Sequence, residues 1–304
     1  MDYKEFKNIL NKQIFESSKR ILLEKIAENP ERYVGLFRPT KPKAKILQNL
    51  LQSNEIRFGD ALEVLFKKYF EECGFKNLEN KIKNGKDDLD LDQFFENKEY
   101  TYFMEQKVRD DHDSTKKRGQ IENFEKKISV LLRKYNESNL KCFMYFIDPC
   151  LIKNKNYYME EIKKLKNDYN VYIKLCYGEE FWHEIGYKNV WEELLIYLEK
   201  WKIELPEMPS INFDEHAEKS FEEIKNIEIP LFRKLFKNKK ICSEILPILF
   251  PQKKVLKLLR EHFKLFSDTS SIHKLLFIKI EEIITDNEKQ LRQSESGSGE
   301  QAAG

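Results

Sequence analysis

The chain has 304 residues, with 54 basic and 52 acidic side chains and a formal net charge of +2. This length suits one large domain or two modest ones. The balanced charge excludes a uniformly basic nucleic-acid-binding protein, so a DNA-facing surface must come from local segregation of charge. The low content of glycine and proline, 10 and 9 residues, favours a helix-rich fold.

The N-terminal segment predicts one packing helix followed by a basic loop. Apolar residues recur at helical spacing between Phe6 and Ile26, and Asn29-Pro30 ends the pattern, so we expect a helix over residues 1–30. The charged N-terminus lacks the apolar segment of a signal peptide. The loop of residues 31–45 carries four candidates for phosphate contacts, or alternatively for a solvated linker, which are Arg38, Lys41, Lys43 and Lys45.

Residues 46–73 predict two further helices, one over 46–52 and one over 59–73. The second has an apolar face of leucine and aromatic residues, and Glu63 lies close to that face. Gly74 fits a helix C-cap. By its residues alone, Glu63 is an ordinary glutamate on a helix surface.

The stretch from Gly85 to Gln120 is the most informative part of the chain. It contains three alternating aspartates, a turn near 96–98 and an apolar run that ends on Glu105-Gln106-Lys107. Side chains alternate along a strand, so Glu105 and Lys107 share a face, and an aspartate on a paired strand can meet Glu105. Two carboxylates and an ammonium suit Mg²⁺-dependent phosphodiester hydrolysis. The alternative is a strand end with a solvated salt bridge.

This pattern resembles the catalytic motif of the PD-(D/E)xK nucleases, and its setting resembles a type II restriction endonuclease. The resemblance assigns metal binding to Asp90 and Glu105, and positioning or activation of the attacking water to Lys107. It also suggests Glu63, on a preceding helix, as a further metal ligand and catalytic residue. The resemblance extends more loosely over about residues 45–205.

The metal-binding aspartate is ambiguous, because Asp88, Asp90 and Asp92 form one repeat. Leu89 stands where the family has a proline before the aspartate. We favour Asp90, which lies fifteen residues before Glu105, a separation that suits a hairpin.

The polar segment 108–118 leaves the predicted strand and precedes a helix expected over 119–137. Arginine and lysine pair with phosphates or guanine edges, and serine and threonine cap helices or bind phosphate, so we predict DNA contacts here. The acidic residues at 110, 111 and 113 temper the charge, and a plain solvated loop is the alternative. The DNA-binding candidates are Arg109, His112, Ser114, Thr115, Lys116, Lys117, Arg118 and Gln120.

The remaining pattern completes an α/β (α+β) fold. Buried strands are predicted at 140–147 and 170–177, around a helix at 157–168, which is the order expected of a restriction-endonuclease-like core with a mixed central sheet flanked by helices. Prolines at 206 and 209 mark a linker to an all-helical C-terminal region. The expected divisions are 1–45, an N-terminal helix and basic loop; 46–205, the nuclease core; 206–293, helices for DNA binding or dimerisation; and 294–304, a disordered tail.

The resemblance implies a type II site-specific deoxyribonuclease that cuts double-stranded DNA with Mg²⁺, as a homodimer, within a restriction-modification system that includes a cognate DNA methyltransferase. Five scattered cysteines indicate a reduced, cytoplasmic protein, and the abundance of Lys, Asn and Ile suggests a bacterium. The apolar runs are too short to cross a bilayer. The alternatives are a repair or phage-defence nuclease without strict sequence specificity, and a non-catalytic DNA-binding or interaction protein.

Overall fold

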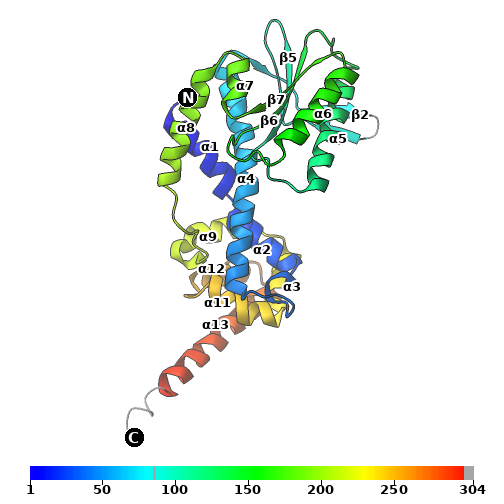
Figure 1. Ribbon diagram of the computed structural model, residues 1–304. Coiled ribbons are helices and arrows are strands. Elements are labelled where there is room, and N and C mark those ends of the chain that lie inside the picture. Colours follow the sequence, from blue (N-terminus) through cyan, green and yellow to red (C-terminus); the bar gives the residue numbers. More distant parts are fainter. Residues whose placement is uncertain (85–86, 298–304) are drawn as a thin grey trace. The chain divides into compact units, whose positions relative to one another are not determined.

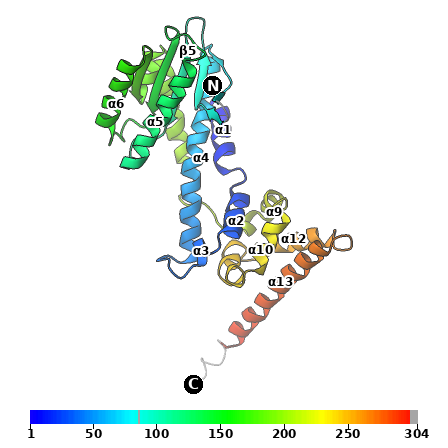
Figure 2. The same ribbon diagram turned by 90° about the vertical axis from the view of Figure 1, so that its right-hand side faces the viewer.

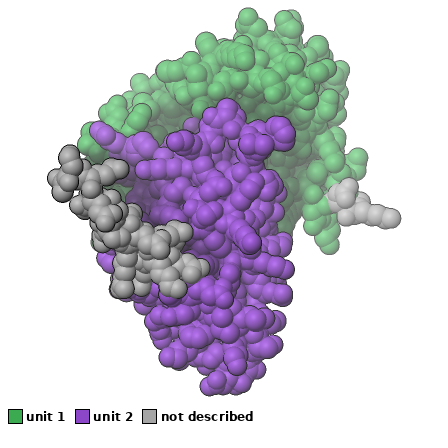
Figure 3. Space-filling model, turned by 90° about the horizontal axis from the view of Figure 1, so that it is seen from below, with its two compact units in different colours: residues 1–14, 56–205 green, residues 15–55, 206–304 purple. Residues whose placement is uncertain are grey.

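The computed structural model describes residues 1–84 and 87–297, which divide into two units (Figure 1, Figure 3). Unit 1 comprises residues 1–14 and 56–205, and unit 2 comprises residues 15–55 and 206–304. The predicted boundary after residue 205 therefore coincides with a boundary between units, whereas the predicted boundary at 45/46 does not. Residues 1–45 are divided between the two units, because residues 1–14 belong to unit 1 and residues 15–45 to unit 2. The part of the predicted tail beyond Gly297 lies outside the described residues.

Unit 1 is built on a five-stranded sheet with the order β1-β4-β5-β6-β7. The strands β4 and β5 form an antiparallel hairpin, and β5, β6 and β7 are parallel. The mixed sheet confirms the predicted fold class. The bounds are Lys76–Asn77 for β1, Gln93–Glu96 for β4, Thr101–Lys107 for β5, Leu140–Phe146 for β6 and Tyr172–Tyr177 for β7.

Helices cover both faces of this sheet. On one face lie α5 (Ser114–Leu131) and α6 (Lys155–Asp168), whose buried residues form a core with Phe103 of β5 and Met144 of β6. On the other face, Phe66 and Phe70 of α4 (Pro42–Glu72) meet Phe95 and the aromatic residues of β6 and α7 (Glu179–Glu184). The central strands β5 and β6 are thus buried on two sides, which explains their nearly continuous apolar sequences.

The acidic repeat does not belong to the five-stranded sheet. Its strand β3 (Asp87–Asp90) pairs with β2 (Lys81–Asn84) in a separate two-stranded sheet, where Lys81 is opposite Asp90. The chain then enters β4 at Gln93. The predicted hairpin is therefore formed by β4 and β5, with its turn held by the Asn97 side chain, which accepts hydrogen bonds from the backbone of residues 99 and 100.

Two helix predictions at the N-terminus were wrong. The single helix expected over 1–30 is two, α1 (Tyr3–Phe15) and α2 (Ser18–Glu28), because Ser17 adopts a left-handed conformation with φ of 60°. Conversely, the two helices expected over 46–73 are one continuous helix, α4. The intervening residues are held by tertiary contacts, since Arg57 donates to the carbonyl of Ile14 at 2.9 Å and Phe58 stacks on Trp201.

The C-terminal part of unit 1 follows β7 closely. Gly178 connects β7 to α7 with φ of 50°, and a Cβ atom there would lie 2.9 Å from Pro149. Only glycine suits both constraints. The helix α8 (Lys188–Ile203) then packs against α1, where Trp201 donates to the side chain of Asn11 at 2.9 Å.

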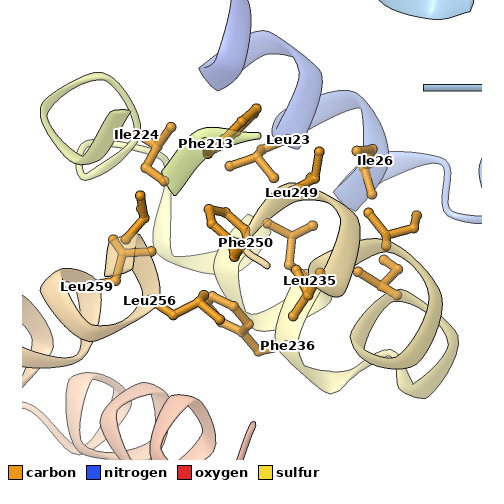
Figure 4. Packing of buried hydrophobic residues seen from close by; sticks show 14 of the residues in the cluster. Leu23, Ile26, Phe213, Ile224, Leu235, Phe236, Leu249, Phe250, Leu256 and Leu259 are labelled. Carbon is orange, nitrogen blue, oxygen red and sulfur yellow. The ribbon is translucent and has the colours of Figure 1, made fainter. Parts of the chain in front are cut away.

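Unit 2 is helical, as predicted for the C-terminal region, and α2 completes its core (Figure 4). Leu23 and Ile26 of α2 share this core with residues such as Leu235 and Leu256. The buried carboxylate of Asp214 caps α12 by accepting from the backbone N–H of Gln252 and Val255, at 2.7 and 2.9 Å. The helices are α3 (Glu31–Val34), η1 (Phe213–His216), α9 (Ala217–Ile224), α10 (Ile229–Lys237), η2 (Ile241–Ile245), α11 (Leu246–Leu249), α12 (Lys254–Lys264) and α13 (Ser271–Gly297).

A search of the described residues for a helix that is long and apolar enough to cross a membrane finds none.

The aromatic core of unit 1 yields a stability prediction. Phe95 is fully buried and stacks on Phe70 with ring centroids 3.9 Å apart and on Tyr102 at 5.0 Å. Replacing it with alanine leaves a cavity, and we expect Phe95→Ala to lower the free energy of unfolding by about 3–5 kcal/mol. The matched control is Phe37→Ala, because Phe37 is 97% exposed. Urea denaturation of both variants measures the difference, and equal losses would contradict this packing.

Candidate active site

The register of the β4–β5 hairpin brings two carboxylates together. Gln93 is paired with Met104, so Asp92, one residue earlier, stands opposite Glu105. The backbone N–H of Gln106 donates to Asp92 Oδ2 at 2.9 Å and holds the aspartate at this position. Opposite residues of an antiparallel pair project their side chains to the same face. Asp92, Glu105 and Lys107 therefore converge at one end of β5. The helix α5 lies beside this strand (Figure 2).

Two ammonium groups join the carboxylates. Lys107 Nζ lies 2.7 Å from Asp92 Oδ2 and 3.0 Å from Glu105 Oε1. Lys127 Nζ, from α5, lies 2.5 Å from Glu105 Oε2 and 3.8 Å from Asp92 Oδ1. The Glu105 side chain is only 2% exposed, whereas Asp92 and Lys107 are 16% and 27% exposed. The site is thus closed at Glu105 and open to solvent at Asp92 and Lys107.

Lys107 is held in its charged form. Burial by itself lowers the pKa of Lys107, but the negative charges of Glu105 and Asp92 and the hydrogen bonds to both more than offset this effect and keep the pKa above its usual value. A lysine that stays protonated cannot accept a proton from water. It can orient a water molecule and offset negative charge that develops on a phosphate.

The structure brings Asp92, and not Asp90, to Glu105 and Lys107. Asp90 is exposed in β3, opposite Lys81 of β2, and Asp88 is exposed in the same strand. The preference for Asp90 is corrected for a physical reason. Asp90 would meet Glu105 only if the aspartate repeat paired directly with β5. The chain instead changes sheets after Asp90, and Asp92 is the aspartate that lies next to the paired part of β4.

Lys127 is the site residue that sequence reasoning missed. It lies on α5 between Phe124 and Ile128, which are both buried in the core. A lysine on the apolar side of an amphipathic helix is unusual, because a buried charge must be paired. The spacing of Phe124, Lys127, Ile128 and Leu131 was therefore a signal in the sequence for a buried cation.

Glu63 lies at the border of the site. Its backbone carbonyl accepts a hydrogen bond from the Gln93 side chain at 2.8 Å, which ties α4 to β4. Burial, followed by the negative charge of Asp92, raises the pKa of Glu63 to about 7, while Lys107 acts in the opposite direction. The glutamate is therefore close enough to sense the charges of both residues.

The segment after β5 is anchored by a buried aspartate. Asp110 is fully buried, and its Oδ2 accepts from Tyr177 Oη at 2.9 Å and from the backbone N–H of Asn154 at 3.0 Å. The Asn154 side chain donates to the carbonyl of His112 at 3.0 Å. These bonds fix the path of residues 108–113. Asp110 thus supports the loop instead of merely tempering its charge.

The helix α5 begins five residues earlier than predicted. Asp113 is its N-cap, because Asp113 Oδ1 accepts from the backbone N–H of Lys116 at 2.8 Å. This hydrogen bond lowers the pKa of Asp113 and favours its charged form. Ser114 to Arg118 are consequently the first turns of α5 and not part of a loop. The predicted capping by serine or threonine is corrected to capping by Asp113.

The DNA-binding candidates differ in their environment. Five are exposed near the start of α5 or on the preceding loop, namely Arg109, Ser114, Thr115, Lys116 and Arg118. His112 and Lys117 are half-buried, and Lys117 Nζ lies 4.4 Å from the centre of the Tyr157 ring. Burial, followed by the positive charge of Lys116, lowers the pKa of His112 and favours neutral imidazole. Gln120 accepts a hydrogen bond from Tyr158 Oη at 2.5 Å and so joins α5 to α6.

The donor set suits a magnesium ion. Among the described residues there is no group of three or more histidine, cysteine, aspartate or glutamate side chains able to hold a metal. Mg²⁺ does not need such a cage, since it is commonly bound by one or two carboxylates together with waters and substrate phosphates. Asp92 and Glu105 provide two carboxylates at hydrogen-bond distance from one ammonium group. The residues present therefore fit a hydrated divalent cation that completes its coordination with water and DNA.

The buried Lys127–Glu105 pair gives a first prediction. Lys127→Met leaves the Glu105 carboxylate buried with one partner fewer, so we expect a loss of about 3 kcal/mol in the free energy of unfolding. Adding Glu105→Gln removes the buried charge that has lost this partner and should recover about 1–3 kcal/mol. Lys126→Met is the control, because Lys126 is exposed one residue away. Denaturant titration measures Lys127→Met, Glu105→Gln, the double variant, Lys126→Met and the unchanged protein, and strictly additive losses for the first three would refute the pairing.

Glu63 gives a prediction about pH. Its pKa rises from 4.5 to about 7 on folding, so the folded state binds this proton more tightly than the unfolded chain. Its contribution to stability is fully present below pH 4.5 and is lost as the pH rises to about 7. In EDTA, Glu63→Gln should therefore reduce the loss of stability between pH 5 and pH 8 by about 1–2 kcal/mol, after discount for partial exposure. The exposed Glu160→Gln should leave that pH dependence unchanged.

Comparison with known families identifies the chain. A family model described as "Type II restriction endonuclease, HinfI" matches residues 2–87 and 76–202. No curated protein and no solved structure matched the chain. The family match includes all of the carboxylates and both lysines of the site. The chain belongs to the HinfI family of type II restriction endonucleases, which cleave DNA at specific sites.

Proposed function

We propose that this protein is a Mg²⁺-dependent type II restriction endonuclease whose active site consists of Asp92, Glu105 and Lys107, with Glu63 as a helper. The single observation that carries the proposal is the position of Lys107 Nζ, which lies 2.7 Å from Asp92 and 3.0 Å from Glu105 at one end of β5. Two strand-borne carboxylates and a lysine on one face supply the groups that divalent-metal phosphodiester hydrolysis needs.

The residues take distinct roles in this proposal. Asp92 and Glu105 would hold Mg²⁺, and Glu63 would add a third carboxylate or orient a water from α4. When bound, the cation would polarise the scissile phosphate and lower the pKa of the attacking water. Lys107, which stays protonated, orients that water and offsets the charge that develops on the phosphate. Lys127 is a positioning residue, because it holds the buried Glu105 carboxylate from the far side.

DNA contacts are proposed for the exposed side chains between β5 and the first turns of α5. Arg109, Lys116 and Arg118 carry the positive charge, and Ser114 and Thr115 offer hydroxyl groups. These side chains follow β5 directly, so a duplex bound there has its phosphates near Lys107. His112, Lys117 and Gln120 support the same surface from half-buried positions.

The assembly and setting are proposed on general grounds. A duplex site with two-fold symmetry is matched by a two-fold pair of subunits, so we propose a homodimer. A nuclease that cuts specific sites needs protection of the host DNA, so we propose a cognate DNA methyltransferase as its genetic partner. The five cysteines are all free, which suits the reducing cytoplasm of a bacterium.

Cleavage of long, unmethylated phage DNA tests the catalytic assignment. The protein should give discrete fragments with Mg²⁺ and no cutting with EDTA. We expect Asp92→Asn and Lys107→Ala each to lower the cleavage rate by on the order of 10²–10³-fold or more, because each removes a charged group that acts on the reacting phosphate.

Asp90→Asn is the matched control, since it changes a neighbouring exposed aspartate in the same way. It should cut within about twofold of the unchanged protein. Loss of cutting in Asp90→Asn with full activity in Asp92→Asn would overturn the assignment. A smear instead of discrete fragments would indicate a nuclease without sequence specificity. Thermal unfolding of each variant separates loss of activity from loss of the fold.

A further inference from the structure

Unit 2 contains a basic groove in a part of the chain that the family match does not reach. The match ends at residue 202. The groove has a volume of about 750 Å³ and lies between α10 and η2 on one side and α13 on the other. Family membership therefore assigns no role to these walls, and their side chains must supply the argument.

The groove is rimmed by positive charge. Arg233, Lys237 and Lys239 line it and are exposed. None of these three side chains forms an ion pair with a side chain of residues 1–84 or 88–285. A fourth basic residue, Lys279 of α13, lies 2.7 Å from Glu282, an acidic residue of the lining. Among the described side chains, the groove thus presents three unneutralised cations, while Glu282 already has a partner.

The positions of these cations are set by the fold. Phe232, Leu235 and Phe236 bury one side of α10, which leaves Arg233 and Lys237, four residues apart, on the other side. The Asn238 side chain accepts from the backbone N–H of Lys240 and Ile241 and so fixes the turn that carries Lys239. The charges stand on a rigid wall, because the residues beneath them belong to the core of unit 2.

We propose that this groove binds the sugar–phosphate backbone of duplex DNA, as a second contact surface besides the active-site segment. Segment 229–245 contains five basic residues and one acidic residue, a local excess of charge in a chain that is nearly neutral overall. A phosphate backbone supplies regularly spaced anions and releases its counterions on binding.

The inference rests on the proposed function only in taking duplex DNA as the ligand, and it does not depend on which residues catalyse cleavage. Binding is therefore measured in EDTA, where no cutting occurs. The groove variant is Arg233→Gln/Lys237→Gln/Lys239→Gln. The matched control is Lys254→Gln/Lys257→Gln/Lys264→Gln, which removes three exposed charges of α12 that do not line the groove.

The readout is fluorescence anisotropy of a labelled duplex over about 50 to 300 mM KCl. For three lost phosphate contacts, the slope of log K against log[KCl] should become shallower by about 2–3, and affinity near 100 mM salt should fall by on the order of 10²-fold. The control variant should keep its slope within about 0.5 of the unchanged protein.

Two results would overturn the proposal. In the first, the groove variant keeps the salt slope of the unchanged protein. In the second, the control variant loses as much affinity and slope as the groove variant, which would indicate a diffuse positive field. An unchanged slope together with a halved molecular mass in solution would assign the groove to a second copy of the chain. Failure of the catalytic assignment would appear only in cleavage, and failure of the groove only in the salt slope.

Discussion

The pairing of β4 with β5 is the constraint on which the active site depends. It sets Asp92 opposite Glu105, and the alternation of side chains along β5 adds Lys107 to the same face. A slip of one residue would turn Asp92 away from Glu105 and expose the aromatic residues that β4 and β5 bury. The same register that fills the core therefore assembles the charged groups, and neither can change without the other.

The site places two carboxylates against two ammonium groups in a largely buried position. Such an arrangement is stable only because every charge has a partner, with Lys127 reaching Glu105 from the helix side and Lys107 bridging Glu105 and Asp92. The division of exposure suits the proposed function. Glu105 is fixed and shielded, while Asp92 and Lys107 remain open to solvent and hence to a phosphate and its water.

The core of unit 2 joins a segment inside the family match to a segment beyond its end. Leu23 and Ile26 lie within the matched residues, and they share one core with Leu235 and Leu256, which lie beyond residue 202. The apolar face of α2 is therefore buried by helices that the family model does not cover. This shared core makes the C-terminal helices part of the folded unit, so the basic groove on α10 and α13 is held by the same packing.

The sequence by itself determined the fold class and the strands at 140–147 and 170–177, and it pointed to the Glu105-Gln106-Lys107 segment as the candidate site, because hydrophobic periodicity and short charged patterns are local signals. The tertiary structure decided what local signals leave open. Asp92 replaced Asp90 because the chain changes sheets between them, Lys127 joined the site because α5 packs over β5, and α4 ran through Gly59 because contacts with other helices hold its middle turns. Each of these outcomes depends on which segment lies opposite another, and residues distant in the chain fix that arrangement only when the core is packed.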